Sequence, residues 1–431
     1  MSVRGAAFLG IGAMVGAGIF ALLGEAGAVA GAAVWLSFLV AGLVAALLGY
    51  TVVKLGVRYP SSGGLIAYLI EGFGNGRLVG VASWLGYFAA IVIVCSMVAV
   101  AFGSYATSLF VGEDAAGGWD NAFASGIVVA MAAINLVGSR IVDRAQSLIV
   151  VVLLAVFAVF IIVTVAEVDW SLLAFSGYPS FADIIASVAL TFFAYLGFSV
   201  ITFAAGDLRD PARELPRAMY LALGVTTLTY VLIALGVFGT LTVDEAIGYG
   251  ETAIAEAARP ALGEAGFVMM AIAALLATSS SVNATLYASG GLTAMLAEVG
   301  QFPTFFGRGS RLGPRAGLLI TAGIVLVVAN LVDLSAIASV GSACSLMIFL
   351  LVGVAAYLTR SETGALAVIV LTAVAATAIV LVFFAIDTVR NAPETFTAII
   401  AIAALAVVLD LVWKSVRIRA AEPGGPEPER R

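Results

Sequence analysis

Residues 10–20 read GIGAMVGAGIF, and this stretch decides the fold that the sequence predicts. Four glycines, Gly10, Gly12, Gly16 and Gly18, fall within nine residues of an otherwise apolar run. Glycine weakens a continuous helix and allows other backbone to approach closely. The stretch therefore predicts an apolar helical segment that is broken along its length.

The composition of the whole chain places this segment in a membrane. Of 431 residues, 62% are apolar and 11% are charged, and the mean hydropathy is +1.15. Soluble domains carry roughly 25% charged residues. The net charge of −6 leaves no basic face for nucleic acid. Histidine is absent, which excludes His–metal sites and Ser–His or Cys–His catalytic pairs. We therefore expect an all-α integral membrane protein that is not an enzyme.

Apolar runs long enough to span a bilayer recur along the chain. They predict twelve transmembrane helices at about 5–29, 31–57, 78–110, 121–138, 146–166, 181–205, 217–242, 260–297, 315–331, 334–358, 364–386 and 393–413. The first run is not expected to be a cleaved signal, because the five glycines between Met1 and Phe20 interrupt the compact helix that a signal requires.

The basic residues predict the orientation. With the N-terminus inside, eighteen of the 20 Lys and Arg fall on the cytoplasmic side, and only Arg259 and Arg390 lie outside. This asymmetry follows the positive-inside rule, so both termini are predicted to be cytoplasmic and the chain to lie in the cytoplasmic membrane. The outer segments carry acids such as Asp120 and Glu251, and Glu25 lies toward the outer end of the first span. A high-salt habitat or the attraction of cations is one interpretation of the outer acids, and a solvated acidic surface is the alternative. For Glu25 the two interpretations are a vestibule residue and a solvated carboxylate at the helix end.

A second broken segment predicts an internal repeat. Residues 192–199 read FFAYLGFS, which places a glycine among aromatic residues in the sixth span. Gly16 and Gly197 are 181 residues apart, and two long spans, 78–110 and 260–297, recur 182 residues apart. An odd number of spans per repeat makes the second copy inverted. We expect a first repeat over 1–180, a second over 181–360, two added spans over 361–414 and a disordered cytoplasmic tail over 415–431.

The two breaks suit a zwitterionic ligand. Backbone N–H groups at the start of a half-helix bind a carboxylate, and carbonyl groups at the end of one bind an ammonium. Gly16, Ala17 and Gly18 fit the carboxylate because small residues let it approach the backbone. Helix packing is the alternative explanation for glycines spaced four apart. For Gly42 and Gly49 packing is the better interpretation.

The motifs together resemble the amino acid–polyamine–organocation (APC) transporter superfamily. The resemblance covers the chain in order from Gly10 to about Leu358. It rests on 10–20, YPSSGG at 59–64, FFAYLGFS at 192–199, GDLRDP at 206–211, LPRA at 215–218 and ATSSSVNATL at 277–286. It implies the leucine-transporter fold, alternating access and amino acid transport. The fold class predicted in this way has twelve transmembrane helices as a five-plus-five inverted repeat plus two.

The resemblance also implies a substrate site. It places the substrate carboxylate at Ala17 and Gly18, the ammonium near carbonyls of the two breaks, and the Phe193 ring over the substrate as a lid. A core or lipid-facing position is the alternative for Phe193. The predicted substrate residues are Met14, Gly16, Ala17, Gly18, Phe193, Ala194, Leu196 and Gly197.

The sequence is compatible with three forms of ion coupling. Ala277, Ser280 and Ser281 share one helical face, and with the carbonyls of Gly12 and Val15 they form a possible sodium site. Ordinary hydrogen bonds between helices are the alternative for these hydroxyls. Proton coupling is the second possibility, and exchange or facilitated transport without a coupling ion is the third. Some proton-coupled relatives carry a lysine in the fifth span, but residues 146–165 contain none.

The expected ligand is a neutral amino acid. No Asp, Glu, Lys or Arg lies near the middle of the first, third, sixth, eighth or tenth span. The alternatives are a carrier or exchanger of cationic amino acids or polyamines, a channel-like protein, and an ion-coupled transporter of another small organic solute. Besides the substrate and the bilayer we expect no cofactor beyond Na⁺ or H⁺. Cys95 and Cys344 are predicted to be buried, and without a cysteine at 111–121 no disulfide-linked accessory subunit is expected.

Overall fold

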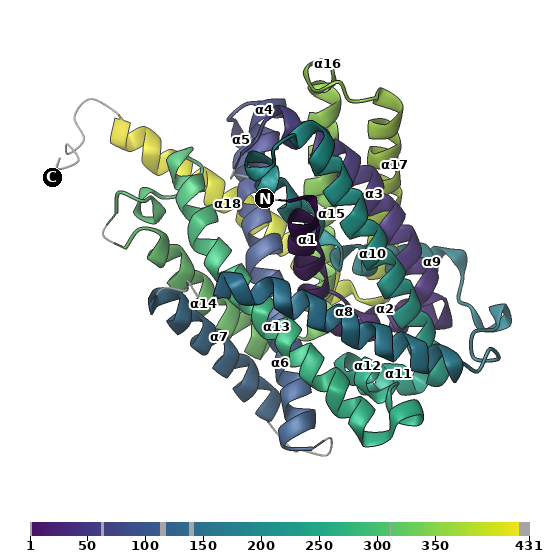
Figure 1. Cartoon of the computed structure of the whole chain (residues 1–431). Helices are drawn as coiled ribbons and strands as arrows, with labels where there is room; N and C mark the ends of the chain where they lie inside the picture. The colour runs from purple at the N-terminus through teal and green to yellow at the C-terminus, as the bar shows by residue number, and fades with distance from the viewer. Residues whose placement is uncertain (1, 62–63, 113–117, 138–141, 311, 422–431) are drawn as a thin grey trace.

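The computed structural model describes residues 2–61, 64–112, 118–137, 142–310 and 312–421. Regular secondary structure within these ranges is helical (Figure 1). The longer helices are α1 (Val3–Ala17), α2 (Ile19–Ala30), α3 (Val34–Arg58), α4 (Gly64–Phe73), α5 (Arg77–Tyr87), α6 (Val94–Phe110), α7 (Trp119–Val137), α8 (Val142–Ala166), α9 (Phe181–Phe193), α10 (Pro211–Thr240), α13 (Arg259–Glu298), α14 (Pro314–Leu331), α15 (Leu334–Leu358), α17 (Ala367–Asn391) and α18 (Pro393–Ala421).

Shorter elements connect these helices. They are the 3₁₀ segments η1 (Gly31–Ala33), η3 (Phe175–Gly177), η4 (Leu196–Asp207), η5 (Gly250–Thr252) and η6 (Thr304–Phe306), the π-helical turn η2 (Phe88–Ile93), and α11 (Val243–Tyr249), α12 (Ala253–Glu256) and α16 (Arg360–Thr363). Because η2 joins α5 directly to α6, the third predicted span is one helix with a π turn inside it. Ser62 and Gly63 of the YPSSGG stretch lie outside the described residues.

The described residues contain ten helices that are long and apolar enough to cross a membrane. An eleventh results if Phe181–Phe193 and Leu196–Thr202, which are bent by 41°, count as one span. The predicted count of twelve is not confirmed. The difference arises at the N-terminal end, where Ile19–Arg58 counts as one stretch of 40 residues. The 15 residues of α1 are fewer than the roughly 20 that span a bilayer alone.

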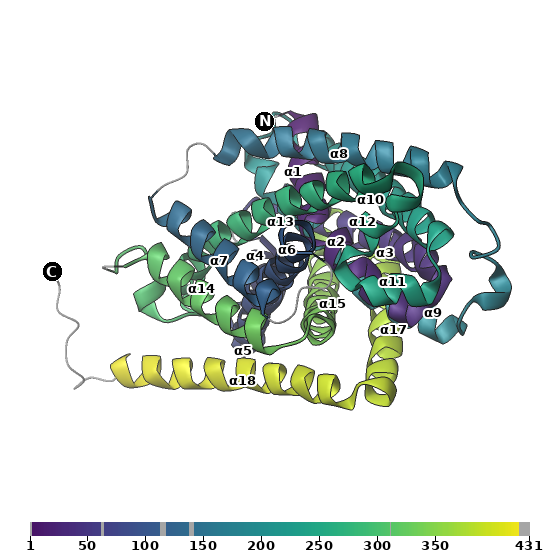
Figure 2. The same ribbon diagram turned by 90° about the horizontal axis from the view of Figure 1, so that it is seen from below.

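Close packing between helices explains two of the predicted glycines. A Cβ atom built on Gly42 of α3 would lie 2.4 Å from Oγ1 of Thr227 in α10, and one on Gly49 would lie 3.2 Å from Cδ1 of Leu223. Both glycines therefore let α3 lie against α10, as the packing interpretation predicts. Seen from below, α8 and α18 lie on opposite edges of the bundle (Figure 2).

The C-terminal helix is longer than the sequence analysis predicts. Disorder was expected over 415–431, but α18 continues to Ala421. No glycine or proline interrupts the chain between Pro393 and Pro423, so the helix has no local stop signal before that point. Residues 422–431 of the predicted tail lie outside the described residues.

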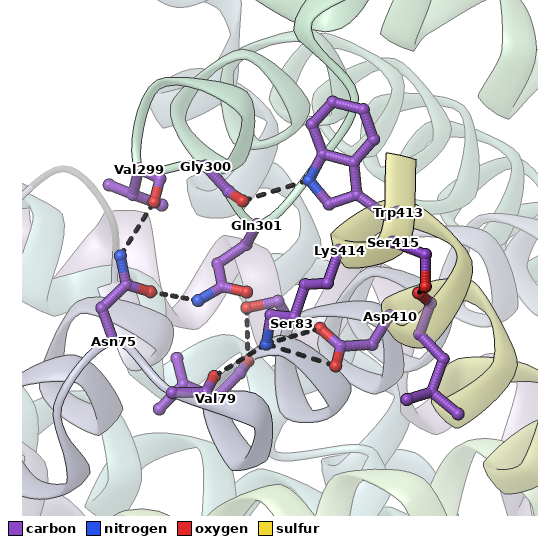
Figure 3. A network of polar contacts seen from close by, with 12 residues as sticks. Asn75, Val79, Ser83, Val299, Gly300, Gln301, Asp410, Trp413, Lys414 and Ser415 are labelled. Atoms are coloured by element: carbon purple, nitrogen blue, oxygen red, sulfur yellow. Dashed lines mark hydrogen bonds and ion pairs between the residues drawn. The ribbon is translucent and has the colours of Figure 1, made fainter. Parts of the chain in front are cut away.

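A polar network joins α18 to the bundle (Figure 3). The ammonium of Lys414 lies 2.9 Å from Oδ1 of Asp410, one helical turn away, and donates to the carbonyl of Gly76 at 3.2 Å. The indole of Trp413 donates to the carbonyl of Gly300 at 3.1 Å. Asp410 is 1% exposed and Lys414 is 25% exposed. The network therefore fixes α18 to the start of α5 and to the connection after α13 through a buried ion pair.

The carbonyl of Val299 fixes the orientation of two side-chain amides in this network, those of Asn75 and Gln301. Asn75 donates from Nδ2 to the carbonyl of Val299 at 2.9 Å, which leaves its Oδ1 to accept from Nε2 of Gln301. Oε1 of Gln301 then points toward Gly80 of α5. A Cβ atom on Gly80 would lie 1.9 Å from Oδ1 of Asp410 and 2.8 Å from Oε1 of Gln301. Only a glycine at this position leaves room for both oxygens.

Candidate functional site

The first predicted break is a single residue. α1 ends at Ala17 and α2 begins at Ile19, with Gly18 between them at φ −107° and ψ −72°. The carbonyl of Gly18 accepts a hydrogen bond from the N–H of Leu22 at 3.0 Å and so starts α2. The glycine run predicts a wider break, but the residues before Gly18 stay helical. A helix satisfies their backbone groups internally, which matters most where water is scarce.

The second break lies at Ala194 and Tyr195. α9 ends at Phe193, and the N–H groups of Ala194 and Tyr195 donate to the carbonyls of Thr191 and Phe192 at 3.1 and 2.9 Å. The chain then turns into η4, a 3₁₀ segment of 12 residues. Both segments that the sequence predicts to be broken are therefore broken in the structure.

The two breaks touch each other. A Cβ atom on Gly18 would lie 2.6 Å from Cβ of Ala194 and 2.8 Å from its carbonyl oxygen. A Cβ atom on Gly197 would lie 2.5 Å from the backbone nitrogen of Met14. Only glycine permits this approach of one backbone to another. The structure thus brings the predicted residues of α1 and α2 together with those of α9 and η4.

Aromatic residues hold the second break in place. The hydroxyl of Tyr195 donates to the carbonyl of Phe38 at 3.0 Å, and that of Tyr230 donates to the carbonyl of Ala194 at 3.4 Å. The two tyrosine rings lie 5.2 Å apart, and all three aromatic residues are fully buried. Sequence reasoning missed Tyr195 and Tyr230 as positioning residues.

Phe193 lies between two further elements. It is 3% exposed. A Cβ atom on Gly341 of α15 would lie 2.5 Å from Cζ of Phe193 and 2.6 Å from Cγ2 of Ile93. Ile93 is the last residue of the π turn η2, and π turns occur frequently at functional sites. Ile93 and Gly341 therefore belong to the surroundings of the break, although no local pattern in the sequence singles them out.

The ends of the half-helices give the junction its chemistry. The N-terminal end of α2 carries a partial positive charge, and the C-terminal ends of α1 and α9 carry a partial negative charge. Gly18 begins α2, and Ala194 ends α9. Groups suited to a carboxylate and groups suited to an ammonium therefore meet at the contact between these two residues.

Part of the predicted sodium site is also brought together. A Cβ atom on Gly16 would lie 3.1 Å from the carbonyl oxygen of Ala277 and 3.7 Å from Oγ of Ser281, so α1 contacts α13 where the sequence predicts. Ser280 lies on α13 between them, and Gly12 and Val15 lie on α1. Since α1 is helical up to Ala17, the carbonyl of Gly12 is one that the helix itself uses, whereas that of Val15 lies in the last turn.

Comparison with known proteins agrees with this architecture. A profile of the amino acid permease family matches residues 1–411. The chain is 34% identical over 357 residues to the inner membrane transport protein YbaT of Escherichia coli, which covers 83% of each chain. It is 27% identical over 380 residues to the methylthioribose transporter of Bacillus subtilis, covering 82% of this chain and 79% of that one.

A further relative and a solved structure extend the comparison. The serine/threonine exchanger SteT of Bacillus subtilis is 26% identical over 302 residues, covering 68% of this chain and 67% of its own. A crystal structure of a manganese transporter mutant from Eremococcus coleocola has a similar fold, with a TM-score of 0.62, 15% identity and coverage of 96% and 94%. These proteins are transporters and not enzymes. Because the family profile covers nearly the whole chain, this multi-pass membrane protein belongs to the amino acid permease family.

Proposed function

We propose that the protein is a secondary carrier that moves neutral amino acids across the cytoplasmic membrane by alternating access. The observation that carries the proposal is the contact of Gly18 with Ala194, where the start of α2 meets the end of α9. The substrate carboxylate binds the N–H groups at Ala17 and Gly18. Its ammonium binds the carbonyls of Met14, Phe193, Ala194 and Leu196. Gly16 and Gly197 keep the backbones close, and Phe193 covers the substrate.

The closeness of the two breaks supports alternating access. A side chain on Gly18 would clash with Ala194, so the two breaks lie close together and we expect an amino acid to enter only when they separate. We propose a twelve-span arrangement, with repeats over 1–180 and 181–360 and two added spans over 361–414, in which the two breaks have opposite orientations. The excess of Lys and Arg in alternate loops supports a cytoplasmic position for both termini.

The side chains at the junction support a preference for neutral substrates. Met14, Ile93, Phe193, Ala194 and Gly341 are apolar. A cationic substrate side chain would require a buried acid, and an acidic one would require a buried base. The name of the relative SteT also points to neutral amino acids. The name of the methylthioribose transporter supports the alternative of another small organic solute.

Proteoliposomes test this function directly. Vesicles preloaded with unlabelled solute are given the same solute in labelled form, for L-serine, L-threonine, L-valine, L-leucine, L-arginine, putrescine and methylthioribose in turn. We expect at least one neutral amino acid to show saturable uptake that preloading stimulates, which distinguishes a carrier from a channel. Counterflow of only arginine, putrescine or methylthioribose, or of none of the seven, would overturn the proposal.

The coupling ion is tested by imposing gradients one at a time. Gly12, Val15, Ala277, Ser280 and Ser281 are the proposed ligands if sodium drives uptake. A sodium gradient alone then accelerates accumulation, and Ser281→Ala removes that acceleration. Ser279→Ala is the matched control, because the hydroxyl of Ser279 already donates to the carbonyl of Leu276 in its own helix. Exchange without a coupling ion shows counterflow but responds to neither a sodium gradient nor a proton gradient.

A further inference from the structure

The end of α3 and the connection between α15 and α17 form one corner of the bundle. α16 lies in this connection, at the end of the molecule where α3 stops (Figure 1). The hydroxyl of Tyr59, the residue after α3, donates to Oε2 of Glu362 in α16 at 2.7 Å. The N–H of Leu366, directly before α17, donates to the hydroxyl of Tyr50 at 2.9 Å. Two hydrogen bonds therefore hold α16 and the start of α17 against the last turns of α3.

Three basic side chains at this corner each lie over the ring of a tyrosine. The distances from the charged group to the ring centre are 5.7, 5.5 and 4.1 Å for Lys54 over Tyr50, Arg58 over Tyr59 and Arg360 over Tyr357. The face of an aromatic ring attracts a cation, although the attraction is small at exposed sites. Each contact therefore holds its basic side chain in place without neutralising the charge.

None of these three basic groups has an ion pair among the residues that the structure describes. Arg360 donates from Nη1 to the carbonyl of Tyr357 at 2.7 Å, which is a neutral acceptor. Two acids lie near Tyr59. Glu362 accepts its hydrogen bond, and Glu71 of α4 acts on Tyr59 more weakly than Glu362 does. Three positive charges against two negative ones leave these residues with a net positive charge.

An exposed apolar stripe leads from the middle of α3 to these charges. Leu43, Tyr50 and Lys54 are spaced by seven and four residues, so they share one face of the helix. Leu43 is 59% exposed, and Tyr50 and Lys54 are partly exposed. α17 packs against α3, and Val368 in its first turn is 77% exposed. The stripe therefore runs from apolar surface that faces lipid, through a tyrosine ring, to an ammonium group.

This order of groups matches the order of groups in an anionic phospholipid. Such a lipid places a phosphate at the membrane surface and acyl chains in the hydrocarbon core. Tyrosine is enriched at the level of the headgroups, and Lys and Arg side chains near helix ends extend toward them. Basic pockets between transmembrane helices bind anionic headgroups. A soluble anion would use the charges alone and would leave the apolar stripe without a ligand group.

We propose that this corner binds one anionic phospholipid. Its phosphate lies among the basic groups of Lys54, Arg58 and Arg360, and one acyl chain lies along Leu43 and Val368. A phosphate diester accepts hydrogen bonds and carries one negative charge, so ammonium and guanidinium donors suit it. The lipid joins α3, which packs against α9 and α10, to the connection between α15 and α17. The inference requires only that the protein spans a membrane, and it does not depend on the transported substrate.

Native mass spectrometry of the purified protein tests the inference without a transport assay. The protein in a neutral detergent is titrated with phosphatidylglycerol or with phosphatidylcholine of the same acyl chains, and the affinity for the first bound lipid is measured. We expect phosphatidylglycerol to bind more tightly. Lys54→Gln and Arg360→Gln should each weaken its binding about five-fold, because a basic residue near an anionic surface contributes about 1 kcal/mol. Lys54→Arg keeps the charge and is expected to retain the wild-type affinity.

A matched control separates this corner from the general attraction of basic residues. Arg315→Gln removes an exposed arginine at the start of α14, a helix on the other side of the bundle from α17 (Figures 1 and 2), and is expected to leave the affinity for phosphatidylglycerol unchanged. Equal affinity of the wild type for the two lipids would overturn the inference, and so would equal losses in Arg315→Gln and Lys54→Gln. Inorganic phosphate at the concentration of the lipid is expected not to displace it, and displacement would assign the corner to a soluble anion instead. Size-exclusion chromatography shows whether each variant is folded.

Discussion

Gly18→Leu is expected to reduce counterflow of every neutral amino acid to the background of empty vesicles while the protein remains folded. Even a Cβ atom at this position would lie 2.6 Å from Cβ of Ala194 and 2.8 Å from its carbonyl oxygen. The leucine side chain would occupy the space between the two breaks where we propose that the substrate binds. Overpacking of this kind costs about 1–3 kcal/mol, which leaves a helical membrane protein intact but distorts the contact.

A second glycine on a membrane helix provides the control. Gly224 of α10 is exposed, and a Cβ atom there would meet nothing within 4 Å. Gly224→Leu is therefore expected to transport at the wild-type rate. Elution on size-exclusion chromatography and the thermal unfolding midpoint report whether each variant is folded. Wild-type counterflow by a folded Gly18→Leu variant would show that the substrate does not pass this junction.

Lys414→Met is expected to lower the free energy of unfolding by about 3–5 kcal/mol, because it leaves the carboxylate of Asp410 buried and without its ionic partner. Asp410 is 1% exposed. Asp410→Asn should cost less, because the ammonium of Lys414 is 25% exposed and can extend toward water. Denaturant titration of the purified protein, followed by tryptophan fluorescence, measures both losses, since Trp413 lies in the same network.

The double variant Asp410→Asn with Lys414→Met isolates the coupling between the two residues. It removes both charges, so we expect it to be more stable than Lys414→Met alone. Glu298→Gln serves as a control, because the ion pair of Glu298 with Arg308 is exposed and exposed pairs contribute little. A loss in Lys414→Met no larger than that in Glu298→Gln would contradict the role of the buried pair.

The broken segments could be predicted because their cause is local. Glycines in the run at 10–20 weaken the helix wherever they stand, so the sequence predicts a break there. It cannot predict that the break is Gly18 alone, because the width depends on what lies opposite. Ala194 faces Gly18, and Ala277 and Ser281 face Gly16, on helices that lie far away in the sequence. The packing of Gly42 and Gly49 was predictable from their spacing of seven residues, which places both on one face of α3.

Contacts between distant helices account for what the sequence analysis missed. Phe193 lies close to Ile93 and Gly341. Nothing in the sequence around Ile93 or Gly341 marks either residue as a neighbour of Phe193. Asp410 differs, because its spacing of four residues from Lys414 is a visible signal of an ion pair within one helix. That signal shows the pair but not that α5 and the connection after α13 enclose it.

The 3₁₀ segment η4 gives the second break a property that the first does not have. It continues for 12 residues, whereas 3₁₀ runs beyond three or four residues are uncommon. A residue rises about 2.0 Å in a 3₁₀ helix and about 1.5 Å in an α-helix, so η4 is about 6 Å longer than the same residues would be in α form. Rewinding η4 would draw the start of α10 toward Ala194 by about that distance. α1 is already an α-helix, so of the two broken segments only the second can shorten by rewinding.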